Sequence, residues 1–115
     1  MNKRKIGSQF EQLTARYLES QGYRILETNF RCRQGEIDII ARDGIYLVFL
    51  EVKYRGDKES GDPMEAVDRK KQKKIVRTAK YYLYQHDLPE DTPCRFDAAG
   101  IADGRMILMK NAFEA

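Results

Sequence analysis

Two apolar segments separated by an Asp-Gly dipeptide constrain the fold of this chain more than any other feature. The segments GEIDIIAR and IYLVFLEVKY flank Asp43-Gly44. An Asp-Gly pair between runs rich in β-branched and aromatic residues is a strong indication of a tight hairpin. We therefore expect antiparallel strands over about 35–42 and 45–54. A two-residue turn at Asp43-Gly44 would pair position 42 with 45, 38 with 49 and 36 with 51.

The rest of the chain adds helices and three more strands. Apolar residues at helical spacing predict an amphipathic helix over 7–21, ended by Gly22. Asp62, Pro63 and Glu65 together form a typical helix start, so we expect a second helix from 62 to about 86. YRILETNF (23–30) reads as a strand, and CRFDAAGI and RMILMK around Asp103-Gly104 predict a closing hairpin. The fold class is thus α/β, with a mixed β-sheet flanked by helices in the order α-β-β-β-α-β-β.

Length and composition favour one ordinary globular domain spanning 1–115. The chain has 115 residues, of which 42% are hydrophobic and 34% charged. No apolar run approaches the roughly 20 residues that span a bilayer, so we expect a cytoplasmic protein with no membrane partner. Cys32 and Cys94 lie in no Cys-x-x-Cys or Cys/His cluster, which argues against a zinc site and for free thiols.

Charged residues interrupt both strands of the first predicted hairpin. Because alternate side chains of a strand share a face, Glu36, Asp38 and Ile40 should point one way and Ile37 and Ile39 the other. A carboxylate among such apolar neighbours needs a counter-charge, several hydrogen-bond donors, a metal or water.

The predicted register places Glu51 and Lys53 on the same face as Asp38, with Glu36 directly opposite Glu51 and Asp38 on the diagonal. Two or three carboxylate oxygens suit Mg²⁺ or Mn²⁺, and a neighbouring lysine can stabilise charge on a phosphate. The pattern predicts metal-dependent phosphodiester hydrolysis. The alternative is a solvated sheet face on which Glu51 and Lys53 make ordinary surface contacts.

Glu11 has two interpretations. On the first helix it lies beside the apolar stripe, between the small residues Gly7 and Ala15, so it could add a carboxylate to this site. Alternatively, Ser8 and Glu11 form a capping box with no functional role.

The second helix carries a run of positive charge, RKKQKKIVRTAK, without an acidic residue. Such a face repels itself unless an anion binds, and the phosphate backbone of a nucleic acid is the obvious partner. The alternative is a plain solvated face. The candidate nucleic-acid-binding residues are Arg69, Lys70, Lys71, Lys73, Lys74 and Arg77, with Arg31 and Arg33 extending the basic surface.

Three residues near this face have open roles. Lys71 falls on the inward stripe, where it either reaches solvent or supplies a cation near the acidic site. Tyr81 and Tyr84 either stack on bases or pack against the protein.

Asp97 lies among apolar residues of the predicted strand CRFDAAGI, and we expect it to make a structural hydrogen bond or ion pair.

Over nearly its whole length, the sequence resembles the YraN-like family of small bacterial proteins. The matching pieces are Gly7, Glu11, Tyr17-Leu18, GY at 22–23, Asn29, Arg31, GEIDIIA, FLEVKYR, EAV at 65–67, Lys71 and RFD at 95–97. That family in turn resembles the PD-(D/E)XK nuclease-like superfamily, which includes archaeal-type Holliday junction resolvases and restriction endonucleases.

The resemblance implies a restriction endonuclease-like core and a set of site residues. Asp38 and Glu51 would be the metal-binding carboxylates, the Val52 carbonyl a further ligand, Lys53 the catalytic lysine and Glu11 the helix-borne acid of junction resolvases. Glu36 matches the GEID motif, but no nuclease role carries over to it. Two departures are Ile37, in place of the proline that names the superfamily motif, and Phe10, where the family often has a small residue.

We therefore expect a nucleic-acid-binding, Mg²⁺-dependent endonuclease that works as a homodimer or on structured DNA. One alternative is a binding module that keeps the fold and the basic surface without catalysis. Another is a protein-interaction module that uses the polar loop at 55–61 and an edge of the sheet.

Overall fold

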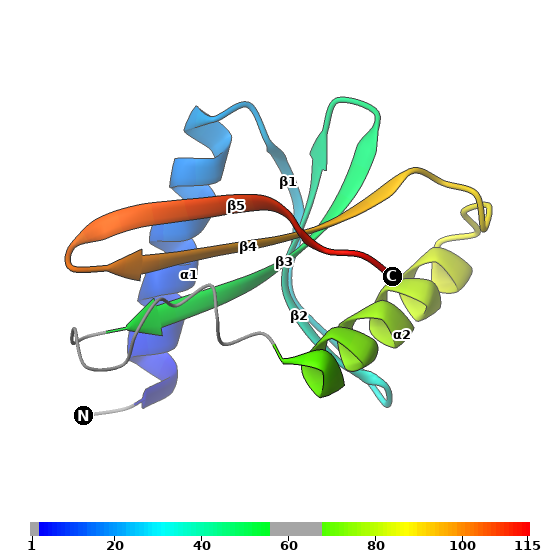
Figure 1. Ribbon diagram of the computed structural model, residues 1–115, viewed down its shortest axis with the longest axis horizontal. Helices are drawn as coiled ribbons and strands as arrows, with labels where there is room; N and C mark the ends of the chain where they lie inside the picture. Colours follow the sequence, from blue (N-terminus) through cyan, green and yellow to red (C-terminus); the bar gives the residue numbers. More distant parts are fainter. Residues whose placement is uncertain (1–2, 56–67) are drawn as a thin grey trace.

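The computed structural model describes residues 3–55 and 68–115, and these form two helices and five strands (Figure 1). The order α-β-β-β-α-β-β is the one predicted from the sequence. No helix in the described part of the chain is long and apolar enough to cross a membrane. The elements are α1 (Lys3–Ser20), β1 (Arg24–Cys32), β2 (Gly35–Asp43), β3 (Tyr46–Arg55), α2 (Arg69–Gln85), β4 (Cys94–Ala102) and β5 (Arg105–Phe113).

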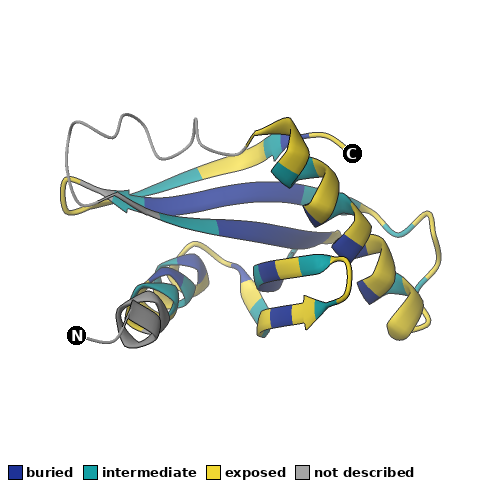
Figure 2. Ribbon diagram, turned by 90° about the horizontal axis from the view of Figure 1, so that it is seen from below, coloured by how far each residue is buried: buried dark blue, intermediate teal, exposed yellow. Residues whose placement is uncertain are grey.

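The five strands form one mixed sheet in the order β1-β2-β3-β4-β5. All neighbours are antiparallel except β3 and β4, which are parallel and are connected through α2. The helices lie on opposite faces: Leu18 of α1 packs with Leu50, whereas Ile75 of α2 packs with Phe49 (Figure 2). This two-sided cover explains why β3 is apolar on both faces, with Val48, Phe49 and Leu50 fully buried.

The first helix ends as predicted, but the second begins later than predicted. Gly22, at a φ of +96°, follows α1. Asp68 adopts an extended conformation and its side chain accepts a hydrogen bond from the Lys71 N–H at 2.8 Å, so α2 starts at Arg69. A continuous helix from 62 is therefore wrong. The predicted cap at Asp62 and most of the loop at 55–61 lie outside the described residues.

The register of the β2–β3 hairpin differs from the prediction by two residues. Asp43 pairs with Tyr46, so the turn is formed by Gly44-Ile45 rather than Asp43-Gly44. Gly44 has a φ of +60°, as expected for the first turn position of a type II′ hairpin. A shift of two residues does not by itself move a side chain to the other face. The Asp103-Gly104 turn, in contrast, forms where it was predicted.

The tip of the β1–β2 hairpin, residues 29–37, bends towards α2 (Figure 1). Ile37 packs in the α2-side cluster with Ile40, whereas Ile39 belongs to the α1-side cluster. The strict alternation predicted from Glu36 to Ile40 is therefore wrong. The cause lies in β1, where Asn29 has a φ of 56° between the paired positions opposite Ile39 and Ile37. A left-handed residue redirects the strand, and Asp38 lies directly beside the bend.

A buried polar network connects Asp97 of β4 with Tyr23, just before β1, and with Asn111 of β5. Asp97 is fully buried and accepts hydrogen bonds from the Tyr23 hydroxyl at 2.7 Å and from the Asn111 N–H at 2.8 Å. Arg95 pairs with Asp97 at 2.9 Å and with Asp43 at 2.7 Å. Burial, reinforced by Asp97, raises the pKa of Tyr23. The structural role predicted for Asp97 is confirmed.

Candidate functional site

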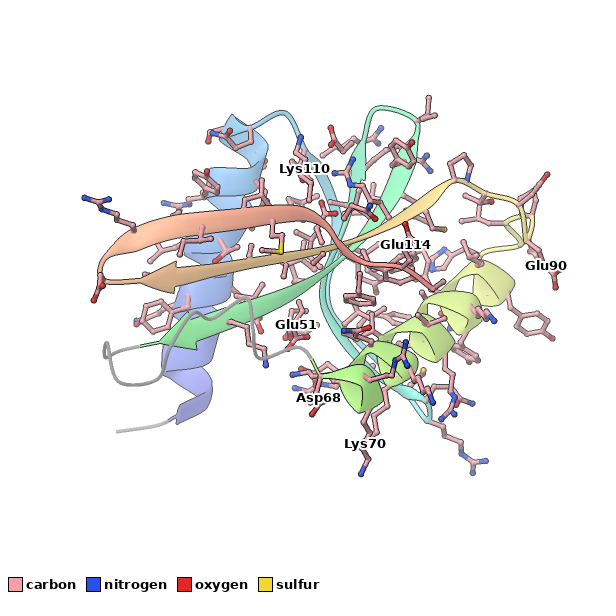
Figure 3. All side chains as sticks on the ribbon, in the orientation of Figure 1. Glu51, Asp68, Lys70, Glu90, Lys110 and Glu114 are labelled. Carbon is pink, nitrogen blue, oxygen red and sulfur yellow. The ribbon has the colours of Figure 1, made fainter. Side chains whose placement is uncertain are left out.

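Asp38 and Glu51 lie next to each other where the β2–β3 ladder stops. The last backbone pair before them is Ile39 with Leu50, so Asp38 and Glu51 occupy the next positions on the two strands. The expectation that Glu36 would face Glu51 is therefore wrong. The Val52 N–H donates a hydrogen bond to Asp38 Oδ2 at 2.8 Å, which fixes the carboxylate beside β3. Glu51 is buried between β3 and the first turn of α2 (Figure 3).

Neighbouring carboxylates repel the negative charge of Asp38. Burial and then repulsion from Glu51 raise the pKa of Asp38 to about 7, although the Val52 hydrogen bond lowers it. Glu11 and Glu36 raise this pKa further. Glu11 of α1 therefore acts on Asp38 across the fold. Its alternative interpretation as part of a capping box is wrong, because α1 begins at Lys3 and Ser8 lies inside the helix.

Two lysines compensate the charge of Glu51. Lys53 Nζ lies 3.5 Å from Glu51 Oε1, and Lys71 Nζ forms a closer ion pair with the same oxygen. Of the two predicted positions for Lys71, the structure has the one beside the acidic site. Burial and the neighbouring Lys71 ammonium lower the pKa of Lys53. Burial also lowers the pKa of Lys71, but hydrogen bonding and attraction to Glu51 outweigh it and raise that pKa overall.

The two carboxylates open into a hollow of about 290 Å³ between the hairpin tip and α2. Gly35 allows this close approach: its φ is +152°, and a Cβ there would lie 3.0 Å from Thr78 Oγ1. Sequence reasoning missed this role of Gly35, although its place at the start of the GEID motif was visible. The residues that line the hollow are Gly35, Glu36, Asp38, Glu51, Lys71, Lys74 and Ile75.

The donor set fits a hard divalent cation in part. Asp38 and Glu51 offer carboxylate oxygens on one wall of the hollow, and oxygen ligands are what Mg²⁺ and Mn²⁺ prefer. Within residues 3–55 and 68–115, no three His, Cys, Asp or Glu side chains are grouped to hold a metal. An ion here would need further oxygens from the backbone, water or a phosphate. Mg²⁺ accepts such a shell readily.

Glu36 lies at the rim of the hollow and has a partner of its own. It forms a 2.9 Å ion pair with Arg31, and both side chains are about half exposed. Arg31 and the exposed Arg33 thus place positive charge on the hairpin tip, at the side of the hollow opposite α2.

The remaining candidate cations lie on the outer face of α2. The helix buries Ile75, Thr78, Ala79 and Tyr82 against the sheet. Its outward side chains are exposed, as the pattern predicted, and Lys70 extends away from the sheet in Figure 3. These exposed cations are Arg69, Lys70, Lys73, Lys74, Arg77 and Lys80.

Fold and site together define an α/β protein in which two carboxylates and a lysine meet beneath a basic helix. Residues 10–101 match the family described as "Uncharacterised protein family UPF0102", and the chain belongs to this family. The YraN-like resemblance seen in the sequence is confirmed by this match.

Curated relatives match along almost their whole length. A UPF0102 protein of Lachnoclostridium phytofermentans is 54% identical over 115 residues, which cover 100% of this chain and 98% of the relative. UPF0102 proteins of Marinobacter nauticus and Persephonella marina are each 44% identical, over 97% and 94% of this chain and 94% and 92% of the relatives.

Proposed function

We propose that this protein is a Mg²⁺-dependent endonuclease with a restriction endonuclease-like core, acting on nucleic acid. The observation that carries the proposal is the placement of Asp38 and Glu51 side by side in a hollow that also holds Lys71 and Lys74. Burial and then repulsion from Glu51 raise the pKa of Asp38 to about 7, so holding both carboxylates ionised costs free energy. A divalent cation would remove that cost.

The carboxylates of Asp38 and Glu51 and the carbonyl of Val52 would hold the ion. When bound, Mg²⁺ supplies positive charge beside the phosphoryl group that is transferred. The hydrogen bond from the Val52 N–H keeps Asp38 in place before substrate arrives. Glu11 adds negative charge from the α1 side and strengthens attraction for the cation.

Lys53 would assist the attack of water on the phosphorus. Its ammonium lies beside Glu51 and is mostly buried, so it could donate a hydrogen bond to an oxygen held next to that carboxylate. The lowered pKa of Lys53 brings proton exchange at Nζ nearer to neutral pH, as general acid–base chemistry requires. In the hydrolysis, the water oxygen would form a bond to phosphorus as the bond between phosphorus and the ester oxygen opposite breaks; the water would lose a proton to solvent and the leaving oxygen would take one up from solvent.

Positive charge on both sides of the hollow would hold the phosphate backbone. Arg31 and Arg33 lie on the hairpin tip, and the exposed cations of α2 lie on the other side. Binding through such contacts releases counterions, so affinity should fall steeply with added salt.

Cleavage assays on purified protein test this proposal. Wild-type protein with Mg²⁺ should cut branched, flapped or single-stranded DNA, and Asp38→Asn and Lys53→Met should each lose at least about a hundredfold in rate. Glu36→Gln is the matched control, because Glu36 lines the same hollow but pairs with Arg31. Unchanged cleavage by Asp38→Asn or Lys53→Met would refute the catalytic assignment.

A second candidate, a nucleic-acid-binding module without catalysis, is favoured by one observation. Lys71 already neutralises Glu51 through an ion pair. In that case the protein would bind nucleic acid with the same salt dependence, and neither Mg²⁺ nor Mn²⁺ would produce cleavage of any substrate.

A further inference from the structure

Two tyrosine rings are exposed on the outer face of α2, among its cations. Tyr84 is 79% exposed and Tyr81 is 39% exposed. Their ring centroids lie 6.5 Å apart, and the Tyr81 ring lies 6.4 Å from that of Phe30 on the hairpin tip. Phe30 is buried, but packing leaves most of Tyr84 and a large part of Tyr81 in water. The alternative that both tyrosines simply pack is therefore wrong for Tyr84.

The two tyrosines continue a line of cations that passes beside the carboxylate hollow. Residues three or four apart in a helix lie on one face. Lys70, Lys74, Arg77, Tyr81 and Tyr84 follow that spacing and are all exposed. We call these five residues the α2 stripe. Lys74 also lines the carboxylate hollow, and from Lys74 the stripe continues to Tyr84 near the far end of α2, a distance of about 15 Å at 1.5 Å per residue.

A hollow with an apolar wall lies beyond the last ring of the stripe. It has a volume of about 380 Å³, and Tyr84 shares its lining with Lys80, Leu83, Leu88 and Glu90. The end of the stripe therefore offers an aromatic face, apolar neighbours and a cation in one place.

Cations in a row followed by exposed aromatic faces are the combination that binds single-stranded nucleic acid. The cations track the phosphates, and the rings stack on the bases whatever their sequence. Within a duplex the faces of the bases are covered by stacking on the neighbouring base pairs, so only unstacked, unpaired nucleotides can stack on the rings. A fully paired duplex would gain only from the cations.

We propose that the α2 stripe binds unpaired nucleotides of a DNA or RNA strand that leads into the carboxylate hollow, with Tyr81 and Tyr84 stacking on their bases. This inference rests on the proposed function and narrows its substrate to nucleic acid with a single-stranded segment.

A single-tryptophan variant tests the stacking directly. The chain contains no tryptophan, so Tyr84→Trp introduces a unique fluorophore at the end of the stripe. The probes are thymidine and uridine oligonucleotides of about 12 nucleotides and a duplex of equal length, in low salt with a chelator that prevents cleavage. We expect the single strands to quench the tryptophan emission and the duplex to leave it unchanged. The thymidine and uridine arms show whether DNA or RNA is preferred, and quenching by either supports the inference.

Affinities of alanine variants, measured by fluorescence anisotropy, complete the test. Tyr81→Ala and Tyr84→Ala should each weaken single-strand binding by about tenfold and duplex binding by less than about threefold. Tyr81→Phe and Tyr84→Phe keep an aromatic ring and should keep wild-type affinity. Tyr46→Ala is the matched control. Tyr46 has a similar exposed fraction, 40%, but it belongs to β3, where its ring contacts Arg95 of β4.

The outcomes separate this inference from the proposed function. Binding without quenching, or equal losses on single strand and duplex, would overturn the stacking inference and leave the proposed function standing. If the protein binds none of the three probes, both the stacking inference and the proposed function are overturned.

Discussion

Replacing Asp38 by asparagine should stabilise the metal-free protein. Burial and repulsion from Glu51 raise the pKa of Asp38 from 3.8 to about 7. The folded protein thus holds this proton more tightly than the unfolded chain does. As pH rises from about 4 to about 7, the unfolded chain ionises first, so the folded state loses stability. Above that range the penalty is complete.

The size of the penalty follows from the pKa shift. At about 1.36 kcal/mol per pKa unit, the rise in the pKa of Asp38 from 3.8 to about 7 corresponds to roughly 4 kcal/mol of unfolding free energy. Asparagine has nearly the same shape, and its carbonyl oxygen can still accept the hydrogen bond from the Val52 N–H. We therefore expect Asp38→Asn to raise the free energy of unfolding by about 2–4 kcal/mol at pH 8 and by less than about 1 kcal/mol at pH 4.

Urea unfolding with a chelator, followed by circular dichroism at several pH values, measures the effect. Glu36→Gln is the control: its exposed ion pair with Arg31 should be worth less than about 1 kcal/mol at any pH. The reasoning is refuted if Asp38→Asn is no more stable than wild type at pH 8, or if its gain does not change with pH.

Other substitutions test the packing and the basic surface. Asp97→Asn removes one of the two carboxylates that pair with Arg95 and leaves Asp43 as the other. It should cost about 1–3 kcal/mol of unfolding free energy in urea titrations, and unchanged stability would contradict the buried network. Gly100→Ala places a Cβ 2.4 Å from the Lys53 carbonyl oxygen, so it should lower stability by about 1–3 kcal/mol, seen as a lower Tm; an unchanged Tm would exclude that close approach. Removing both Lys70 and Lys74 should reduce the slope of log affinity against log salt by about two, whereas an unchanged slope would exclude them from phosphate contact.

The sequence was sufficient to predict the order of the elements and the common face of Asp38, Glu51 and Lys53, because both depend on local pattern. Asp38, Glu51 and Lys53 keep their common face although the turn moved by one position, since a register shift of two preserves side-chain direction. The turn itself could not be predicted, because Asp43-Gly44 and Gly44-Ile45 both place glycine where a hairpin turn accepts it.

Features that depend on tertiary packing could not be predicted. The bend at Asn29 brings Ile37 onto the α2 side, and no alternation pattern reveals a single left-handed residue within a strand. The ion pair between Lys71 and Glu51 requires knowing that α2 starts at Arg69 and crosses the end of the β2–β3 ladder. For Lys71, helical periodicity gave the direction but not the partner.

Calorimetric titration of Mn²⁺ tests the central claim, that Asp38 and Glu51 form a metal site, most directly. The titration should be made with and without a single-stranded oligonucleotide, because a substrate phosphate can complete the shell of the ion. Asp38→Asn and Glu51→Gln are the test variants, and Glu36→Gln is the control. We expect binding to wild type and to the control and none to either test variant. Equal binding to all four proteins, or no binding to wild type even with the oligonucleotide present, would contradict the metal site.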